Sequence, residues 1–175
     1  MYRIKKNISI FIAFFIIISL SSVQFTSAKP SNKKVKKAYL TYLQNHADSL
    51  DLLDGYENEI EYYDVNKDGI KELFYCNGGG SIDVALTYYK GKVKKLSTQM
   101  THISHGKINN KTYLVEADHY GIWYIFYSIK KGKKIQRFSV WENRETGKFY
   151  YQSAKKGSKE KTISEKAYKK YTNIL

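Results

Sequence analysis

Short polar connections between aromatic and β-branched runs are the feature that most constrains the fold of this chain. From residue 59 onward such runs are separated by turn dipeptides, for example Asn109-Asn110 and Thr146-Gly147. Connections of this length join antiparallel neighbours, because parallel strands need a crossover of a dozen or more residues. The 17 Tyr, 8 Phe and single Pro agree, since aromatic residues are enriched in strands and proline is depleted. The sequence therefore predicts an antiparallel β meander.

Eight runs show this strand pattern. They are residues 59–63, 73–76, 82–90, 92–96, 111–118, 121–129, 134–141 and 148–152. Gly91 allows the reversal between the third and fourth runs, which predicts a hairpin over residues 82–96. No strand is predicted between residues 97 and 110 or after residue 152.

Two helices flank the predicted meander. Apolar residues at spacings of three and four between Val35 and His46 predict an amphipathic helix, with Ser31 or Asn32 as its N-cap. Ser164 caps a shorter helix over residues 165–171. The predicted fold class is α+β, with an N-terminal helix, an antiparallel β meander and a short C-terminal helix.

The first 28 residues resemble a secretory signal peptide. A basic start that includes Arg3 precedes an apolar run over residues 8–20, and small residues follow as far as Ala28. The run is shorter than the roughly 20 apolar residues that span a bilayer core. We therefore expect cleavage after Ala28 and a secreted protein with no membrane anchor. An uncleaved anchor is the alternative.

The predicted organisation is a signal peptide (1–28), an N-terminal helix with an acidic linker (29–58) and a β-rich domain (59–175). The chain has a single cysteine, Cys76, which excludes an intramolecular disulfide framework and any multi-cysteine metal site. Because the predicted exit of the signal peptide lacks a cysteine, no lipid attachment is expected there.

Charge is distributed unevenly along the chain. Residues 48–72 contain nine acidic and two basic residues, whereas residues 73–175 contain 20 basic and seven acidic residues. Such a change of sign suggests two electrostatic faces, of which the basic one would attract an anionic cell-wall or surface polymer. The alternative is that lysines coat exposed strands and discourage aggregation. Nucleic acid is not an expected partner for an exported chain.

The strongest chemical motif is the nine-residue segment from Asp64 to Glu72, DVNKDGIKE. Asp64, Asn66 and Asp68 alternate, so their side-chain oxygens would lie on one side of a tight turn at the following glycine. The carbonyl of Ile70 and the carboxylate of Glu72 complete five donors. Calcium takes six to eight oxygen ligands in flexible geometry, whereas magnesium demands a rigid octahedron. The segment predicts one Ca²⁺ site. A metal-free hairpin turn is the alternative, because Asn, Asp and Gly favour turns.

The pattern Asp-x-Asn-x-Asp-Gly-x-x-Glu between two strands resembles the calcium loops of FG-GAP/VCBS-type proteins. An EF-hand would need a glutamate at the twelfth loop position, where Tyr75 stands. Dockerin modules carry two copies of a similar loop, each leading into a helix, whereas this chain has one copy leading into a predicted strand. Residues 59–97 also resemble small secreted proteins of Gram-positive bacteria. The resemblance implies a secreted calcium-binding module and no particular activity.

Other candidate residues are less specific. Glu116 and Asp118 share one strand face and, with His119, are the residues that a small extracellular hydrolase would use. In strand geometry, His102 and His105 would fall on opposite faces, which argues against a zinc site. Aromatic residues around Gly121 suit either sugar stacking or the core, and the core is the prediction. They are Tyr120, Trp123, Tyr124 and Tyr127.

Taken from the residues alone, the expected function is that of a non-enzymatic, calcium-binding β module that contacts an anionic polymer. Two alternatives stay open at this stage. One is the small hydrolase, and the other is a secreted inhibitor or adhesion-type protein.

Overall fold

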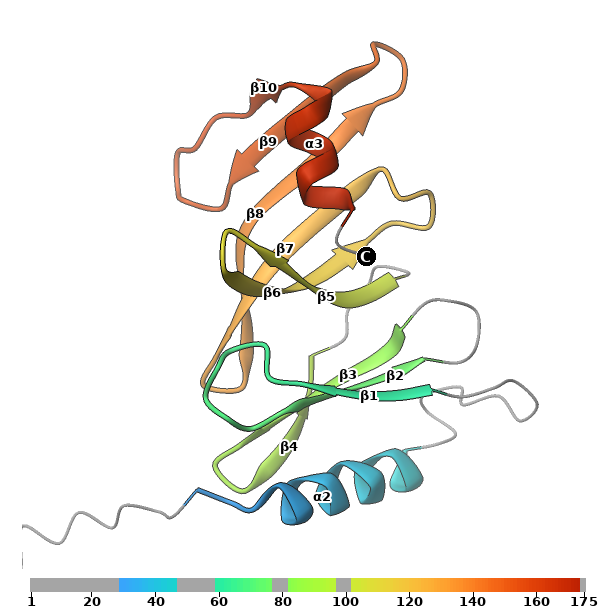
Figure 1. Cartoon of the computed structure of the whole chain (residues 1–175), viewed down its shortest axis with the longest axis vertical. Coiled ribbons are helices and arrows are strands. Elements are labelled where there is room, and N and C mark those ends of the chain that lie inside the picture. Colours follow the sequence, from blue (N-terminus) through green and yellow to red (C-terminus); the bar gives the residue numbers. More distant parts are fainter. Residues whose placement is uncertain (1–28, 47–58, 77–81, 97–101, 174–175) are drawn as a thin grey trace, which may run out of the picture. The chain divides into compact units, whose positions relative to one another are not determined.

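The computed structural model describes residues 29–46, 59–76, 82–96 and 102–173 (Figure 1). The predicted signal peptide and the remaining residues, including the acidic segment 47–58 and residues 77–81, lie outside the described residues. The chain divides into two units, residues 1–30 and 31–175, and every element described below belongs to the second. Neither of the described helices is long and apolar enough to cross a membrane.

The predicted α+β class is confirmed. Within the described residues, two helices accompany ten strands in two antiparallel sheets. The first sheet has the order β1-β2-β3-β4, and the second has the order β10-β9-β8-β7-β6-β5. The first contains β1 (Glu59–Tyr63), β2 (Glu72–Cys76), β3 (Ile82–Tyr89) and β4 (Lys92–Lys95). The second contains β5 (His102–Ile108), β6 (Lys111–Ala117), β7 (Trp123–Lys130), β8 (Lys133–Asn143), β9 (Lys148–Ser153) and β10 (Lys161–Ile163).

All eight predicted strands are present, with ends that shift by at most two residues. Strands β5 and β10 were not predicted. β5 contains two histidines and Gly106 and lacks a regular apolar alternation, and β10 is only three residues long. Both are edge strands, so their place in the sheet depends on partners rather than on their own pattern.

Helix α2 (Asn32–Asn45) begins where the sequence predicts. The Ser31 side chain caps it by accepting a hydrogen bond from the N–H of Lys34 at 3.3 Å. The helix buries Val35, Tyr39 and Leu43, which belong to the predicted apolar face. Helix α3 (Glu165–Thr172) is capped in the same way by Ser164, whose Oγ accepts from the N–H of Ala167 at 3.2 Å.

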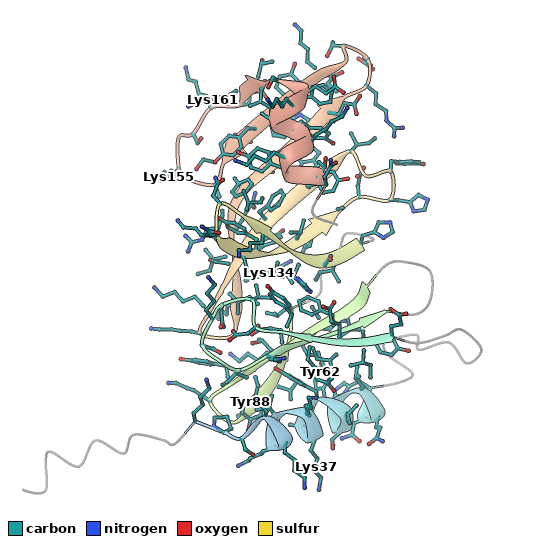
Figure 2. The ribbon with its side chains drawn as sticks, viewed as in Figure 1. Lys37, Tyr62, Tyr88, Lys134, Lys155 and Lys161 are labelled. Carbon is teal, nitrogen blue, oxygen red and sulfur yellow. The ribbon has the colours of Figure 1, made fainter. Side chains whose placement is uncertain are left out.

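Alternation along each strand divides the apolar residues among three clusters. On β2, Leu73 and Tyr75 join residues of α2, whereas Phe74 faces the other way and joins residues of the second sheet. Tyr62 and Tyr88 also lie on the side of the first sheet that faces α2 (Figure 2). The third cluster joins the opposite face of the second sheet to Tyr168 of α3. The first sheet is therefore apolar on both faces.

The tip of the β7–β8 hairpin approaches the first sheet closely. Gly132 has φ +67°, and a Cβ added there would lie 2.7 Å from Cβ of Tyr89 and 3.0 Å from Cδ of Lys94. Both distances are too short for ordinary contacts. This turn therefore needs glycine for its backbone conformation and for its contact with β3 and β4.

Candidate metal centre

The predicted calcium loop connects β1 to β2. Gly69 has φ +75° and Lys67 has φ +58°, so the chain reverses direction through two left-handed residues. The positive φ of Gly69 agrees with the sharp turn that the motif predicts at this glycine. The loop places the end of β1 and the start of β2 next to each other, and Tyr63 pairs with Glu72 in the sheet.

Three predicted ligand side chains turn into the loop and bind its backbone. Asp64 Oδ2 accepts a hydrogen bond from the N–H of Gly69 at 2.7 Å. Asn66 Oδ1 accepts from the N–H of Asp68 at 2.9 Å, and Asp68 Oδ1 accepts from the N–H of Ile70 at 2.8 Å. Asn66 Nδ2 also donates to Asp68 Oδ2 at 3.0 Å. The structure therefore brings Asn66 and Asp68 together, whereas Asp64 binds the backbone at Gly69.

The second carboxylate oxygen of Asp64 is the exception in this network. Among the described residues, Asp64 Oδ1 is the one buried side-chain oxygen or nitrogen without a hydrogen-bond partner. Leaving a buried acceptor unsatisfied costs on the order of 1–3 kcal/mol, and more for a charged group. The loop thus holds a carboxylate oxygen in a position where a cation would compensate its burial.

Glu72, the last predicted ligand, is fully buried at the start of β2. Its Oε2 accepts from the N–H of Val65 at 3.0 Å, and its Oε1 accepts from the hydroxyl of Thr87 at 3.0 Å. Burial raises the pKa of Glu72 to about 7, although both hydrogen bonds favour the ionised form and oppose this rise.

Helix α2 supports the end of the loop. The hydroxyl of Tyr39 donates to the carbonyl of Lys71 at 3.0 Å. Burial raises the pKa of Tyr39 far above its ordinary value, and the nearby carboxylates of Glu72 and Asp68 raise it further. Tyr39 is therefore a neutral donor. The sequence predicts Tyr39 only as part of the apolar helix face. It predicts neither its hydrogen bond to the loop nor the hydrogen bond from Thr87 to Glu72.

The arrangement is not that of a closed metal site. In the described ranges, no group of three or more His, Cys, Asp or Glu side chains has the geometry to hold a metal ion. Asp68 and Glu72 instead direct oxygens to the backbone N–H groups of Ile70 and Val65. Ile70 itself is half-buried and packs against the cluster beneath α2.

The buried Glu72 predicts a pH effect on the calcium-free protein. Its pKa rises from 4.5 to about 7, so between these values the folded state keeps a proton that the unfolded state has lost. The neutral Glu72 therefore contributes fully to the free energy of unfolding below pH 4.5, and this contribution is lost as the pH rises through 7. The free energy of unfolding should fall by about 3 kcal/mol across this range. Urea unfolding in a calcium chelator at pH 5 and pH 8 measures it.

Glu72→Gln is the control for this titration, because glutamine has nearly the same shape and no proton to lose. The variant should be less sensitive to pH than the wild type by about 3 kcal/mol over this interval. Identical pH dependence in the two proteins would show that Glu72 does not titrate in this range.

The hydrolase candidates have separate partners in the structure. Glu116 is buried, and its carboxylate accepts from the hydroxyl of Tyr127 at 3.0 Å and from Lys134 Nζ at 2.5 Å. Asp118 Oδ1 accepts from the N–H groups of Ile122 and Trp123 at 2.7 and 2.9 Å, which closes the β6–β7 turn. These contacts give both carboxylates a role in the fold.

The histidines do not form one cluster. Nε2 of His105 lies 3.0 Å from Oε1 of Glu61, and its ring stacks on Tyr63 at 3.9 Å. His102 instead stacks on His119, with 6.2 Å between ring centroids. The two β5 histidines thus contact different neighbours, in agreement with their predicted opposite faces.

The aromatic residues around Gly121 divide between core and surface. Tyr127 is buried and Tyr124 is half-buried, as the core interpretation predicts. That interpretation is wrong for Tyr120 and Trp123, which are 69% and 45% exposed. Trp123 stacks on Trp141 at 5.2 Å with an interplanar angle of 20°. The stacking therefore covers one face of each indole.

Comparison of the chain with protein-family models, with curated proteins and with solved structures finds no match.

Proposed function

We propose that residues 64–72 bind one Ca²⁺ and that the ion stabilises a secreted, non-enzymatic β module. The observation that carries this proposal is the buried, unpartnered Oδ1 of Asp64 in a loop that also contains the paired side chains of Asn66 and Asp68. Asn66, Asp68, the Ile70 carbonyl and Glu72 would supply further oxygens, and water would complete the six to eight that calcium prefers.

Binding would exchange hydrogen bonds for metal bonds. Asp68 and Glu72 would release the N–H groups of Ile70 and Val65 and turn toward the ion. Glu72 would also lose its proton, because metal ligands bind in their deprotonated form. The three carboxylates then face a dication, so the ion would offset most of their mutual repulsion.

Calcium titration of the purified protein tests the site. We expect one ion per chain by calorimetry, and a rise in unfolding free energy of about 2.7 kcal/mol when free calcium is 100 times the Kd. The Asp64→Ala/Asp68→Ala variant should show neither the heat nor the stabilisation. Magnesium should compete poorly, because it prefers a rigid octahedral shell.

Glu145→Gln/Glu160→Gln is a matched control, since both glutamates are exposed and the change of charge is the same. This control should bind calcium as the wild type does. The site is wrong if millimolar calcium gives no heat, or if the Asp64→Ala/Asp68→Ala variant binds as well as the control.

The module's proposed task is to bind an anionic cell-wall or surface polymer outside the cell. The support is the excess of 20 basic over seven acidic residues in the region 73–175, which contains most of both sheets. The non-enzymatic interpretation has better support than the hydrolase, because Glu116 and Asp118 already have partners that explain them.

A further inference from the structure

A hollow of about 510 Å³ lies beside the candidate calcium loop. Residues from four parts of the chain line it, namely the loop, the start of β6, the second half of β7 and the middle of β8. Its size is within the range of about 300–1,000 Å³ that is usual for binding sites of small molecules. The hollow can therefore admit one charged group together with the part of a polymer that carries it.

The hollow is strongly basic. Lys67, Lys111 and Arg137 line it, and none of its lining residues is acidic. Like charges that surround a concave surface focus the electrostatic potential and raise the local concentration of counter-ions. This concentration of positive charge distinguishes the hollow from lysines that are spread along exposed strands.

Neighbouring groups hold two of these cations in place. Arg137 Nε donates to the hydroxyl oxygen of Ser128 at 2.7 Å, and Lys67 Nζ donates to the carbonyl of Asn110 at 3.3 Å. The bond to Ser128 uses one of the five N–H donors of the guanidinium. The paired Nη groups are the part of arginine that binds two oxygens of an oxyanion. The hydroxyl of Thr112 adds a neutral donor to the lining.

We infer that this hollow binds a phosphate or sulfate group carried on an extracellular polymer. A guanidinium fork, two ammonium groups and hydroxyl donors from several directions suit a tetrahedral anion, which presents oxygens on all sides. The inference rests on the proposed polymer-binding function. It adds where on the protein the polymer binds and which chemical group of the polymer is recognised. Its test leaves Lys67 unchanged, so that the calcium loop stays intact.

The test measures binding of the full chain, in saturating calcium, to three anionic polymers. These are a poly(glycerol phosphate), heparin as a sulfated polymer and polygalacturonate as a carboxylate polymer. The Lys111→Gln/Arg137→Gln variant should bind the phosphate or sulfate polymer at least tenfold more weakly. Lys155→Gln/Lys161→Gln removes the same charge at two exposed positions outside the hollow and should change affinity less than twofold (Figure 2).

The outcomes separate the inference from the function beneath it. If polymers bind and the two variants weaken binding equally, the overall positive charge is responsible. That result overturns the hollow as the binding site but leaves the proposed polymer binding intact. If none of the polymers binds the wild type, the proposed function and the inference both fail. Polygalacturonate that binds as tightly as the other two polymers overturns the preference for a tetrahedral group.

Inorganic phosphate serves as a competitor that distinguishes a free ion from a polymer-borne group. Displacement of the polymer by millimolar phosphate from the wild type supports recognition of the group itself. Binding of free phosphate without any binding of polymer overturns the polymer as the source. Unchanged urea midpoints of both variants, within the error of the wild type, show that loss of binding does not reflect unfolding.

Discussion

Lys134→Met is expected to lower the free energy of unfolding by about 3 kcal/mol, because it removes the cation from a buried carboxylate. Glu116 Oε1 lies 2.5 Å from Lys134 Nζ, and the glutamate is only 1% exposed. Lys134 Nζ also lies 4.5 Å from the ring centroid of Tyr127, whose hydroxyl donates to the same carboxylate. Methionine keeps the length of the side chain and loses the charge, so packing changes little.

Two further variants give this experiment its controls. Lys133→Met changes an exposed neighbour and should alter stability by less than about 0.5 kcal/mol. Glu116→Gln combined with Lys134→Met removes both charges and should recover much of the loss, since the penalty comes from the unpaired charge. Urea unfolding provides all four stabilities. Equal losses in Lys133→Met and Lys134→Met would contradict the structural role of the ion pair.

Phe126→Ala is expected to cost about 3–5 kcal/mol, because a large cavity opens beneath α3. Phe126 is fully buried on β7 and stacks on Phe138 with 4.4 Å between ring centroids. The rings of Tyr113 and Tyr171 contact it edge-on, each with 6.1 Å between ring centroids. The Phe126 ring therefore connects β6, β8 and helix α3. Its removal should loosen the helix as well as the sheet.

Near-UV circular dichroism and urea unfolding measure this effect. Phe126→Leu should lose considerably less stability, because leucine fills part of the space. Tyr120→Ala removes a ring that is 69% exposed and should have only a small effect. If Phe126→Ala and Tyr120→Ala lose the same stability, the aromatic cluster does not hold α3 in place.

Local features of the sequence predicted most of the fold. The strands of the β7–β8 and β8–β9 hairpins have a clear apolar pattern and turn residues that adopt φ > 0, such as Gly132 and Gly147. Strand β5 has no such signal, because its segment contains two histidines and Gly106 and lacks a regular apolar alternation. Its partner is nevertheless local, since it pairs with β6 across the turn at residues 109–110.

The candidate site also combines local features that the sequence predicts with long-range contacts that it does not. The spacing of Asp64, Asn66 and Asp68 predicts a loop whose oxygens lie on one side, and the structure pairs Asn66 with Asp68 while Asp64 binds the backbone of the same loop. The burial of Glu72 could not be predicted, because it depends on Thr87, which lies 15 positions away and belongs to another strand. The support from Tyr39 spans 32 positions and depends on how α2 packs.

The order of the strands has a consequence for how the chain reaches its fold. In both sheets, each hydrogen-bonded neighbour of a strand is also its neighbour in the sequence. The entropy lost on closing each connection is therefore small, and topologies rich in such local pairings fold faster than those that join distant segments. A chain that emerges N-terminus first could add one strand at a time to the strand just formed. Each strand edge would then be exposed only briefly before its partner arrives, which limits the time available for pairing with another molecule.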